Sequence, residues 1–404
     1  MQNTYDADPT GVSWSGTNYA IGRLTQSFAI NYFPGPDYTQ GKVTKNMQYD
    51  QRGRVITQRL QLTATGGSLA FPTFPTFQQA LTYNDADQLV TSTTTTTPAG
   101  QGYTFTNVYD STGALSGLSN NTSSTPDLAT LVYNARAQLD TINFQTSTGG
   151  ALAAEQFQYD ANLRTTSATA TWGANSGTSG TIFSQARTYD PADNVTSLAT
   201  TQAAVPNTTN SGGSETEAFC YDEQNRLVWA GNTGTPPAAG NGTCGSGPSN
   251  SLAGAGYSNA YVYTHLGQLW QGPLNGSGTQ EQYLYCTSNT HQLVGLYPTK
   301  SGATCSNYST KTAGYSIGRY DGFGNVASRT AKGTTDTLTY DILDHLTQWY
   351  ANATNQEQYL YDANGQRVLR RFTNGNGTTI LTYPFGIEEH QYSGSGSNQH
   401  DTYY

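Results

Sequence analysis

Acidic side chains at regular spacing are the first candidates for chemistry in this sequence. Asp321 and Asp341 each follow a tyrosine, Tyr320 and Tyr340, in the stretch RYDGFGNVASRTAKGTTDTLTYDILDHL. Two carboxylates held close together could act as a general acid and a general base. An aspartate can instead start a turn by accepting a hydrogen bond from a backbone N–H two residues on. We favour the second interpretation because the same dipeptide recurs along the chain.

The C-terminal region offers a second set of candidates. Glu388, Glu389 and His390 (IEEHQ), with His400 and Asp401 (QHD), could supply metal ligands or a base. A metal site needs a further group of ligands, and none is visible in the sequence. We therefore expect a solvated C-terminal segment and neither a metal nor a cofactor.

No GxSxG, HExxH or P-loop motif occurs, so we expect a protein that is not an enzyme.

The four cysteines fall into two local pairs, Cys220 with Cys244 and Cys286 with Cys305. Neither pair has the CxxC spacing of a zinc site or a redox motif. Each pair opens at a Tyr-Asp-like unit and closes in the connection that follows. We predict two local disulfides, which are typical of a secreted or cell-surface protein. Four independent buried thiols are the alternative.

The Tyr-Asp dipeptide, or a close variant, begins twelve repeat units. They start at Tyr49, Tyr83, Tyr109, Tyr133, Tyr159, Tyr189, Tyr221, Tyr263, Tyr285, Tyr320, Tyr340 and Tyr361. With the tyrosine as position 0, Gly, Asp or Asn predominates at +4 and Leu or Val at +6. The motif residues that we single out are Tyr49, Asp50, Gly53, Tyr109, Asp110, Gly113, Tyr221, Asp222, Tyr320, Asp321, Gly324, Tyr340, Asp341, Tyr361, Asp362 and Gly365.

The residue types in each unit predict a β-hairpin. Gly, Asn and Asp adopt left-handed backbone conformations at low cost, so position +4 can close a type I turn between two strands. The tyrosine can then pair across the hairpin with the aliphatic residue at +6. Three units deviate, and there we expect changes of loop or register. The unit at Tyr159 has Leu163 and Thr165, the last unit has Arg367 at +6, and the unit at Tyr285 reaches its aliphatic residue only at Leu293.

Composition supports an all-β protein. Of 404 residues only 11% are charged, whereas 29 are Tyr and 44 are Gly, which suits strands and tight turns. The net charge of -9 argues against binding to nucleic acid. No apolar run approaches the ~20 residues of a membrane span, and residues 1–16 do not form a signal peptide. We expect export to depend on a segment outside this chain, or the chain to be a fragment.

The twelve units resemble the YD repeats of the RHS family; YDGFGNV, YDQRGRV and YDANGQR are close to that family's repeat core. The resemblance implies a β-hairpin array that coils into a spiral β-sheet shell, as in bacterial RHS proteins, teneurins and the C component of insecticidal toxin complexes. We expect an incomplete, open shell. Residues 1–48 would form a partial N-terminal repeat, 49–372 the hairpin array, and 373–404 the last strands and a Gly/Ser-rich tail. The family's DHLGS-like core motif is absent, so its cleavage aspartates are not carried over.

In bacterial relatives such a shell encloses a toxic C-terminal domain. The resemblance therefore implies a structural segment that encapsulates a toxin or other cargo encoded downstream, in a protein of the polymorphic-toxin type. The alternative is a cell-surface adhesion module whose exposed aromatic side chains bind glycans. Five tryptophans could stack on sugar faces: Trp14, Trp172, Trp229, Trp270 and Trp349.

Overall fold

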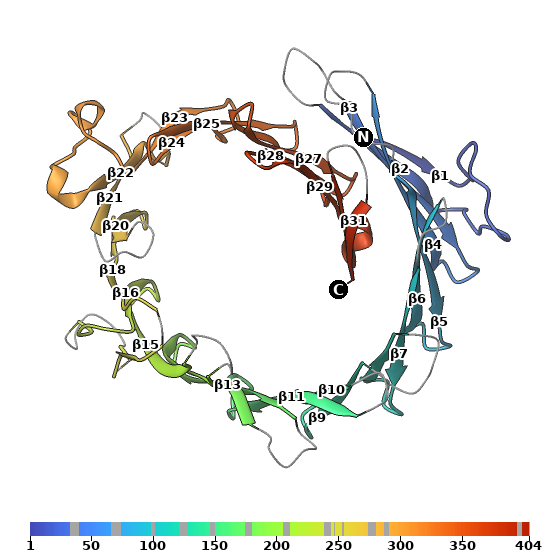
Figure 1. The fold of residues 1–404 in the computed structure, drawn as a ribbon, viewed down its shortest axis with the longest axis horizontal. Helices are drawn as coiled ribbons and strands as arrows, with labels where there is room; N and C mark the ends of the chain where they lie inside the picture. The colour runs from blue at the N-terminus through green and yellow to red at the C-terminus, as the bar shows by residue number, and fades with distance from the viewer. Residues whose placement is uncertain are drawn as a thin grey trace. The chain divides into compact units, whose positions relative to one another are not determined.

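The fold is described from a computed structural model, and it is built almost entirely of antiparallel β-strands that follow one another along the chain (Figure 1). The structure describes residues 1–32, 40–65, 74–97, 102–120, 128–145, 150–173, 180–204, 211–237, 244–245, 247–252, 254–273, 280–286, 291–393 and 398–403. Within these residues the only helical elements are three short 3-10 turns, and none could span a membrane. The all-β expectation is confirmed.

The chain divides into two compact units. Unit 1 comprises Met1–Asn107, Asn120–Thr122 and Ile317–Tyr404, and unit 2 comprises Val108–Ser119 and Ser123–Ser316. The strands that lie wholly or mostly in unit 1 are β1 (Gln2–Tyr5), β2 (Leu24–Tyr32), β3 (Gln40–Tyr49), β4 (Val55–Thr65), β5 (Thr76–Tyr83), β6 (Leu89–Thr97), β7 (Tyr103–Tyr109), β23 (Tyr315–Tyr320), β24 (Val326–Ala331), β25 (Thr334–Tyr340), β26 (Leu346–Asn352), β27 (Asn355–Tyr361), β28 (Arg367–Asn374), β29 (Gly377–Thr382), β30 (Glu388–Ser393) and β31 (Asn398–Tyr403), with the 3-10 turn η3 (Pro384–Gly386).

Unit 2 contains the remaining strands. They are β8 (Leu115–Ser119), β9 (Ala129–Tyr133), β10 (Leu139–Gln145), β11 (Ala151–Tyr159), β12 (Thr165–Trp172), β13 (Gly180–Tyr189), β14 (Val195–Gln202), β15 (Gly213–Tyr221), β16 (Leu227–Gly231), β17 (Ser249–Asn250), β18 (Ser258–Ala260), β19 (Val262–Tyr263), β20 (Leu269–Pro273), β21 (Gln280–Leu284) and β22 (Gly295–Pro298), with the 3-10 turns η1 (Thr299–Ser301) and η2 (Tyr308–Thr310).

Each regular repeat unit is a hairpin with one geometry. In the first unit, Asp50 N–H donates to the Arg54 carbonyl and Gly53 N–H donates to the Asp50 carbonyl, both at 3.0 Å. Tyr49 then pairs with Val55, whereas Gln48 pairs with Thr57, so the return strand carries one extra residue. Such a β-bulge bends a strand and increases its twist. The same shift recurs at Tyr83, Tyr159, Tyr189, Tyr221, Tyr263, Tyr340 and Tyr361.

Two of the three deviant units do not deviate in structure. Leu163 takes a left-handed φ of 67°, and Tyr159 pairs with Thr165 in the usual register. Arg367 likewise pairs with Tyr361 in the usual register. Our expectation of changed loops or register was wrong there, because backbone hydrogen bonds fix the turn whatever side chain stands at +4 or +6. The third unit is lengthened as expected: β21 ends at Leu284, which pairs with Gly295 at the start of β22.

The largest core lies in unit 1, where two groups of strands pack face to face. Val43, Leu60 and Phe77 from β3 to β5 are buried with Leu360, Leu369 and Ile380 from β27 to β29. A Cβ on Gly41 would overlap the Leu360 side chain, so the two layers approach closely at this point. The Asn31 side chain completes the contact, because its amide donates to the Tyr361 carbonyl at 3.1 Å and its oxygen accepts from Tyr361 N–H at 3.2 Å. Residues from the two ends of the sequence therefore form one hydrophobic core.

Candidate functional site: the joint between repeats

The repeat tyrosines join neighbouring hairpins through their hydroxyl groups. In unit 2, Tyr189 Oη donates to the Thr165 carbonyl at 2.7 Å and Tyr221 Oη donates to the Val195 carbonyl at 2.9 Å. Each acceptor is the +6 residue of the preceding repeat. Further pairs with the same geometry are Tyr83 with Val55, Tyr133 with Leu115, Tyr159 with Leu139, Tyr263 with Leu227 and Tyr361 with Leu346.

The strand register explains why this hydroxyl is needed. The ladder between β12 and β13 begins at Ser167, two residues beyond Thr165, and that between β14 and β15 begins at Ser197, two residues beyond Val195. The +6 residue therefore lies outside the ladder that its return strand forms with the next strand, and the next tyrosine supplies a donor to its carbonyl. A partly buried carbonyl without a donor would cost about 1–3 kcal/mol. Burial raises the pKa of Tyr221, which keeps its hydroxyl protonated and able to donate.

Position +5 forms a second bridge, on the turns. Arg164 Nε donates to Oδ2 of Asp160 in its own unit at 2.7 Å. The same guanidinium lies 2.6 Å from Asp193 Oδ1 of the next unit and 4.5 Å above the ring of Tyr189. Arg54 repeats this arrangement with Asp50, Asp87 and Tyr83. At the Asp321 and Asp341 turns Asn325 replaces the arginine, donating to Asp321 Oδ2 at 3.1 Å and to Asp344 Oδ1 at 2.7 Å.

The two aspartates that suggested acid–base chemistry are both turn residues. Asp321 Oδ1 accepts from the N–H groups of Phe323 and Asn325 at 2.9 and 2.8 Å. Asp341 Oδ1 accepts from the N–H groups of Leu343 and His345 at 2.8 and 3.0 Å. Slight burial of Asp321 raises its pKa, but hydrogen bonds from Asn325 and Phe323 lower it further, so the net pKa lies below the usual range. An ionised carboxylate saturated by backbone donors is a poor general acid.

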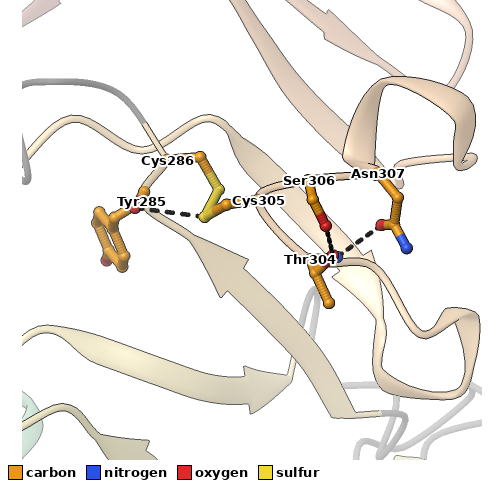
Figure 2. The surroundings of a disulfide bond; sticks show 6 residues. All are labelled: Tyr285, Cys286, Thr304, Cys305, Ser306 and Asn307. Atoms are coloured by element: carbon orange, nitrogen blue, oxygen red, sulfur yellow. Dashed lines mark hydrogen bonds between the residues drawn. A yellow bond between two sulfur atoms is a disulfide. The ribbon is translucent and has the colours of Figure 1, made fainter.

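Both cysteine pairs are joined in disulfides in the structure, and both occur where the repeat is irregular. Cys220, at the end of β15, is bonded to Cys244 beyond β16, and Ala218, Trp229 and Ala260 pack around it. Cys286, just after β21, is bonded to Cys305 in the segment between η1 and η2 (Figure 2). Figure 2 also shows Thr304 N–H donating to Asn307 Oδ1 at 2.8 Å, which orders the loop beside the second disulfide.

The C-terminal candidates are not a solvated segment. Glu388 and His390 lie on β30 and are each 2% exposed, and the His390 ring lies against Phe77. His390 Nδ1 is 2.6 Å from Asp401 Oδ1 on β31, and Nε2 is 3.4 Å from Glu388 Oε2. Our expectation was wrong because the alternation of buried and exposed residues along β30 was not recognised. Glu389 points to the other face, and the His400 side chain lies outside the described residues.

Glu388, His390 and Asp401 form an ion-pair network in which Glu388 and His390 are buried and Asp401 is exposed. Burial lowers the pKa of His390, but hydrogen bonds and attraction from Glu388 and Asp401 raise it by more, so the net pKa lies above its ordinary value. No group of His, Cys, Asp and Glu side chains in the described part of the chain is arranged to hold a metal ion.

Comparisons with known proteins identify the fold. No protein-family model and no curated protein sequence matches the chain. A chain in the structure of the Photorhabdus luminescens Tc holotoxin pore is similar over 99% of this chain, with a TM-score of 0.63 and 14% identity. A chain in the crystal structure of a complex of TcdB2, TccC3 and Cdc42 is similar over 88% of this chain, with a TM-score of 0.47 and 14% identity.

The first comparison shows a shared fold, in agreement with the β-hairpin shell that the sequence motifs led us to expect. The fold class, an open antiparallel β-hairpin array of the spiral-shell type, is confirmed as well. This chain spans 19% of the length of the chain in the holotoxin pore structure and 20% of that in the complex.

Proposed function

We propose that this chain is a wall segment of an RHS-type shell that encloses a toxin or other cargo polypeptide encoded downstream in the same protein. The observation that carries the proposal is the likeness of 99% of the chain to part of the Tc holotoxin pore structure. The joints between repeats agree with it, because they tie hairpin to hairpin through the tyrosines and the turns. We assign the wall no catalytic step, since the carboxylates at +1 and +4 are engaged in those turns and joints.

Containment is tested on the longest polypeptide that the reading frame encodes, by limited proteolysis. We expect a segment downstream of this chain to resist a protease in the intact protein. The same segment should become sensitive when Leu369→Asp disrupts the core of unit 1. An intact protein whose downstream segment is cleaved as fast as in the variant would contradict containment, and so would a reading frame that ends with this chain.

A glycan-binding adhesion module is the second candidate, and two exposed tryptophans support it. Trp172 on β12 is 54% exposed and Trp270 on β20 is 36% exposed, so both rings are accessible to a sugar face. Trp229 is 4% exposed and is not available for such stacking. Binding on a glycan array that disappears in Trp172→Ala and Trp270→Ala would favour adhesion over containment. Either function implies a secreted or cell-surface protein, which we propose as its location.

A further inference from the structure

Two neighbouring turns of unit 1 expose large apolar side chains. Phe323 is 78% exposed, Ile342 is 90% exposed and Leu343 is 50% exposed. These side chains stand at +2 and +3, two positions that take no part in the backbone-to-backbone hydrogen bonds of the turn. The corresponding positions are Ser-Thr at 111–112 and Ala-Asn at 363–364. The turn therefore does not require apolar residues here, and another reason for them must exist.

Phe323, Ile342 and Leu343 line a groove within unit 1. It has a volume of about 730 Å³, and Ile30 and Tyr32 at the end of β2 contribute to its lining. Ile30 is 39% exposed and Tyr32 is 56% exposed. A groove of this size can hold a few side chains of a bound molecule.

The charged side chains that line the groove are acidic. Asp321, Asp341 and Asp362 line it, and the described lining contains neither Lys nor Arg. Arg54, Arg164 and Arg226 neutralise the +1 aspartate in three other units, whereas the three turns here have Asn325, His345 and Gln366 at +5. His345 Nδ1 lies 3.0 Å from Asp341 Oδ2. Burial lowers the pKa of Lys45 and the nearby Asp362 carboxylate opposes this, so Asp362 has a partial counter-charge. Asp321 and Asp341 have no cationic arginine partner of this kind.

We propose that this groove binds a short peptide segment that combines apolar side chains with Lys or Arg. The apolar residues would pack on Phe323, Ile342 and Leu343, and the cationic groups would face the Asp321 and Asp341 turns. Charge complementarity selects this occupant, because oppositely charged surfaces steer encounter and fix register. A second copy of this chain carries a net charge of -9 and matches an acidic groove poorly. The proposal stands independently of containment.

Other repeat units have different residues at the same turn positions, and these residues can be substituted here without loss of the turn. Ile342→Ala with Leu343→Asn copies Ala363-Asn364, and Phe323→Thr copies Thr112. Asp321→Asn and Asp341→Asn copy Asn84, whose side-chain oxygen accepts from Ala86 and Gln88 N–H groups as the aspartates do. The matched controls lie in unit 2: Leu266→Asn removes a side chain at +3 that is 57% exposed, and Asp110→Asn removes a charge at +1.

The test measures binding of a fluorescent peptide of alternating Leu and Lys by fluorescence anisotropy at pH 8. We expect the triple apolar variant to weaken binding by more than tenfold, because each side chain loses buried apolar area. The double Asp→Asn variant should weaken binding about fivefold at low salt and remove most of its salt dependence. Leu266→Asn and Asp110→Asn should bind the peptide as the parent does. Circular dichroism checks that every variant is folded.

Three outcomes would overturn the proposal. The first is equal binding of a peptide in which Glu replaces Lys. The second is unchanged affinity in the folded triple apolar variant. The third is concentration-dependent self-association of the parent chain in sedimentation, abolished in the triple apolar variant, because the groove would then be an interface between copies.

Discussion

At the scale of the residue, one chemical group explains why the repeat uses tyrosine. The ring packs as phenylalanine would, but only the hydroxyl reaches the carbonyl at +6 of the preceding repeat, as Tyr221 does with Val195 at 2.9 Å. All twelve repeat units begin with Tyr and none with Phe, although the chain contains 13 Phe. This bias was the sequence signal for the joint, and it could have been recognised before the structure was known.

Tyr221→Phe tests the joint directly. We expect the free energy of unfolding to fall by about 1–3 kcal/mol, since the Val195 carbonyl loses its donor while the ring remains. Urea denaturation followed by circular dichroism measures the change. Tyr5→Phe is the matched control, because Tyr5 is 52% exposed and should change stability by less than about 0.5 kcal/mol. Equal effects of the two substitutions would show that the hydroxyl bridge contributes nothing.

Leu163 provides the opposite test, a stabilising change. Its φ of 67° is left-handed, a conformation that costs a residue with a Cβ about 1–2 kcal/mol. The side chain is 54% exposed, so little packing is lost on its removal. Leu163→Gly should therefore raise the unfolding free energy by about 1 kcal/mol, whereas Gly113→Leu, at the equivalent position with φ 87°, should lower it by a similar amount. A Leu163→Gly variant that is less stable than the parent would contradict this account.

At the scale of the element, the hairpin was predictable and its irregularities were not. Positions +1 and +4 indicated the turn because Asp and Gly have strong local preferences. The bulge after +6 was not predicted, because register depends on the neighbouring strand rather than on local sequence. The burial of Glu388 and His390 was missed for a related reason, since the His390 ring packs against Phe77, more than 300 residues earlier in the chain.

The two disulfides stabilise the segments where regular hairpins are interrupted. They span 24 and 19 residues, and each should contribute about 3 kcal/mol by restricting the unfolded chain. Thiol labelling of the unfolded protein without reductant should detect no free cysteine, and four free thiols would contradict both bonds. Cys286→Ser with Cys305→Ser should increase hydrogen exchange in residues 291–314, and Cys220→Ser with Cys244→Ser is the matched variant for the first loop.

The β30–β31 hairpin should make stability depend on pH through His390. Its folded pKa is raised above the unfolded value of about 6.5, so the stabilisation is complete below that pH and is lost as pH rises through the folded pKa. We expect thermal unfolding of the parent to shift to lower temperature as pH rises through this range. His390→Gln should remove that dependence, whereas His265→Gln, on a turn of unit 2, should leave it unchanged. A parent chain whose stability is constant from pH 6 to about 9 would contradict this role.

At the scale of the whole molecule, the contact that no local pattern could reveal is the core of unit 1. The repeat motif predicted hairpins near both ends of the chain, but not that the faces of β3–β5 and β27–β29 meet. Asn31 carries no repeat signal at all, yet its amide forms two hydrogen bonds with the backbone of Tyr361, 330 residues away. The resemblance to RHS shells predicted a β-hairpin array, whereas the contact between Asn31 and Tyr361 is seen only in the structure.

The last prediction concerns the core of unit 1. A substitution in a strand near the C-terminus should also destabilise strands near the N-terminus. Leu369 is fully buried against residues from β3 to β5, and Leu369→Ala should cost about 2–5 kcal/mol. Hydrogen exchange should then increase in β27–β30 and equally in β3–β5, while the strands of unit 2 keep their protection. Leu284→Ala, in the small core of unit 2 with Tyr297 and Ala303, is the matched control and should show the reverse pattern. If Leu369→Ala changes exchange only in β27–β30, the two layers are not one cooperative unit, and the first strands of the chain are stabilised without the last.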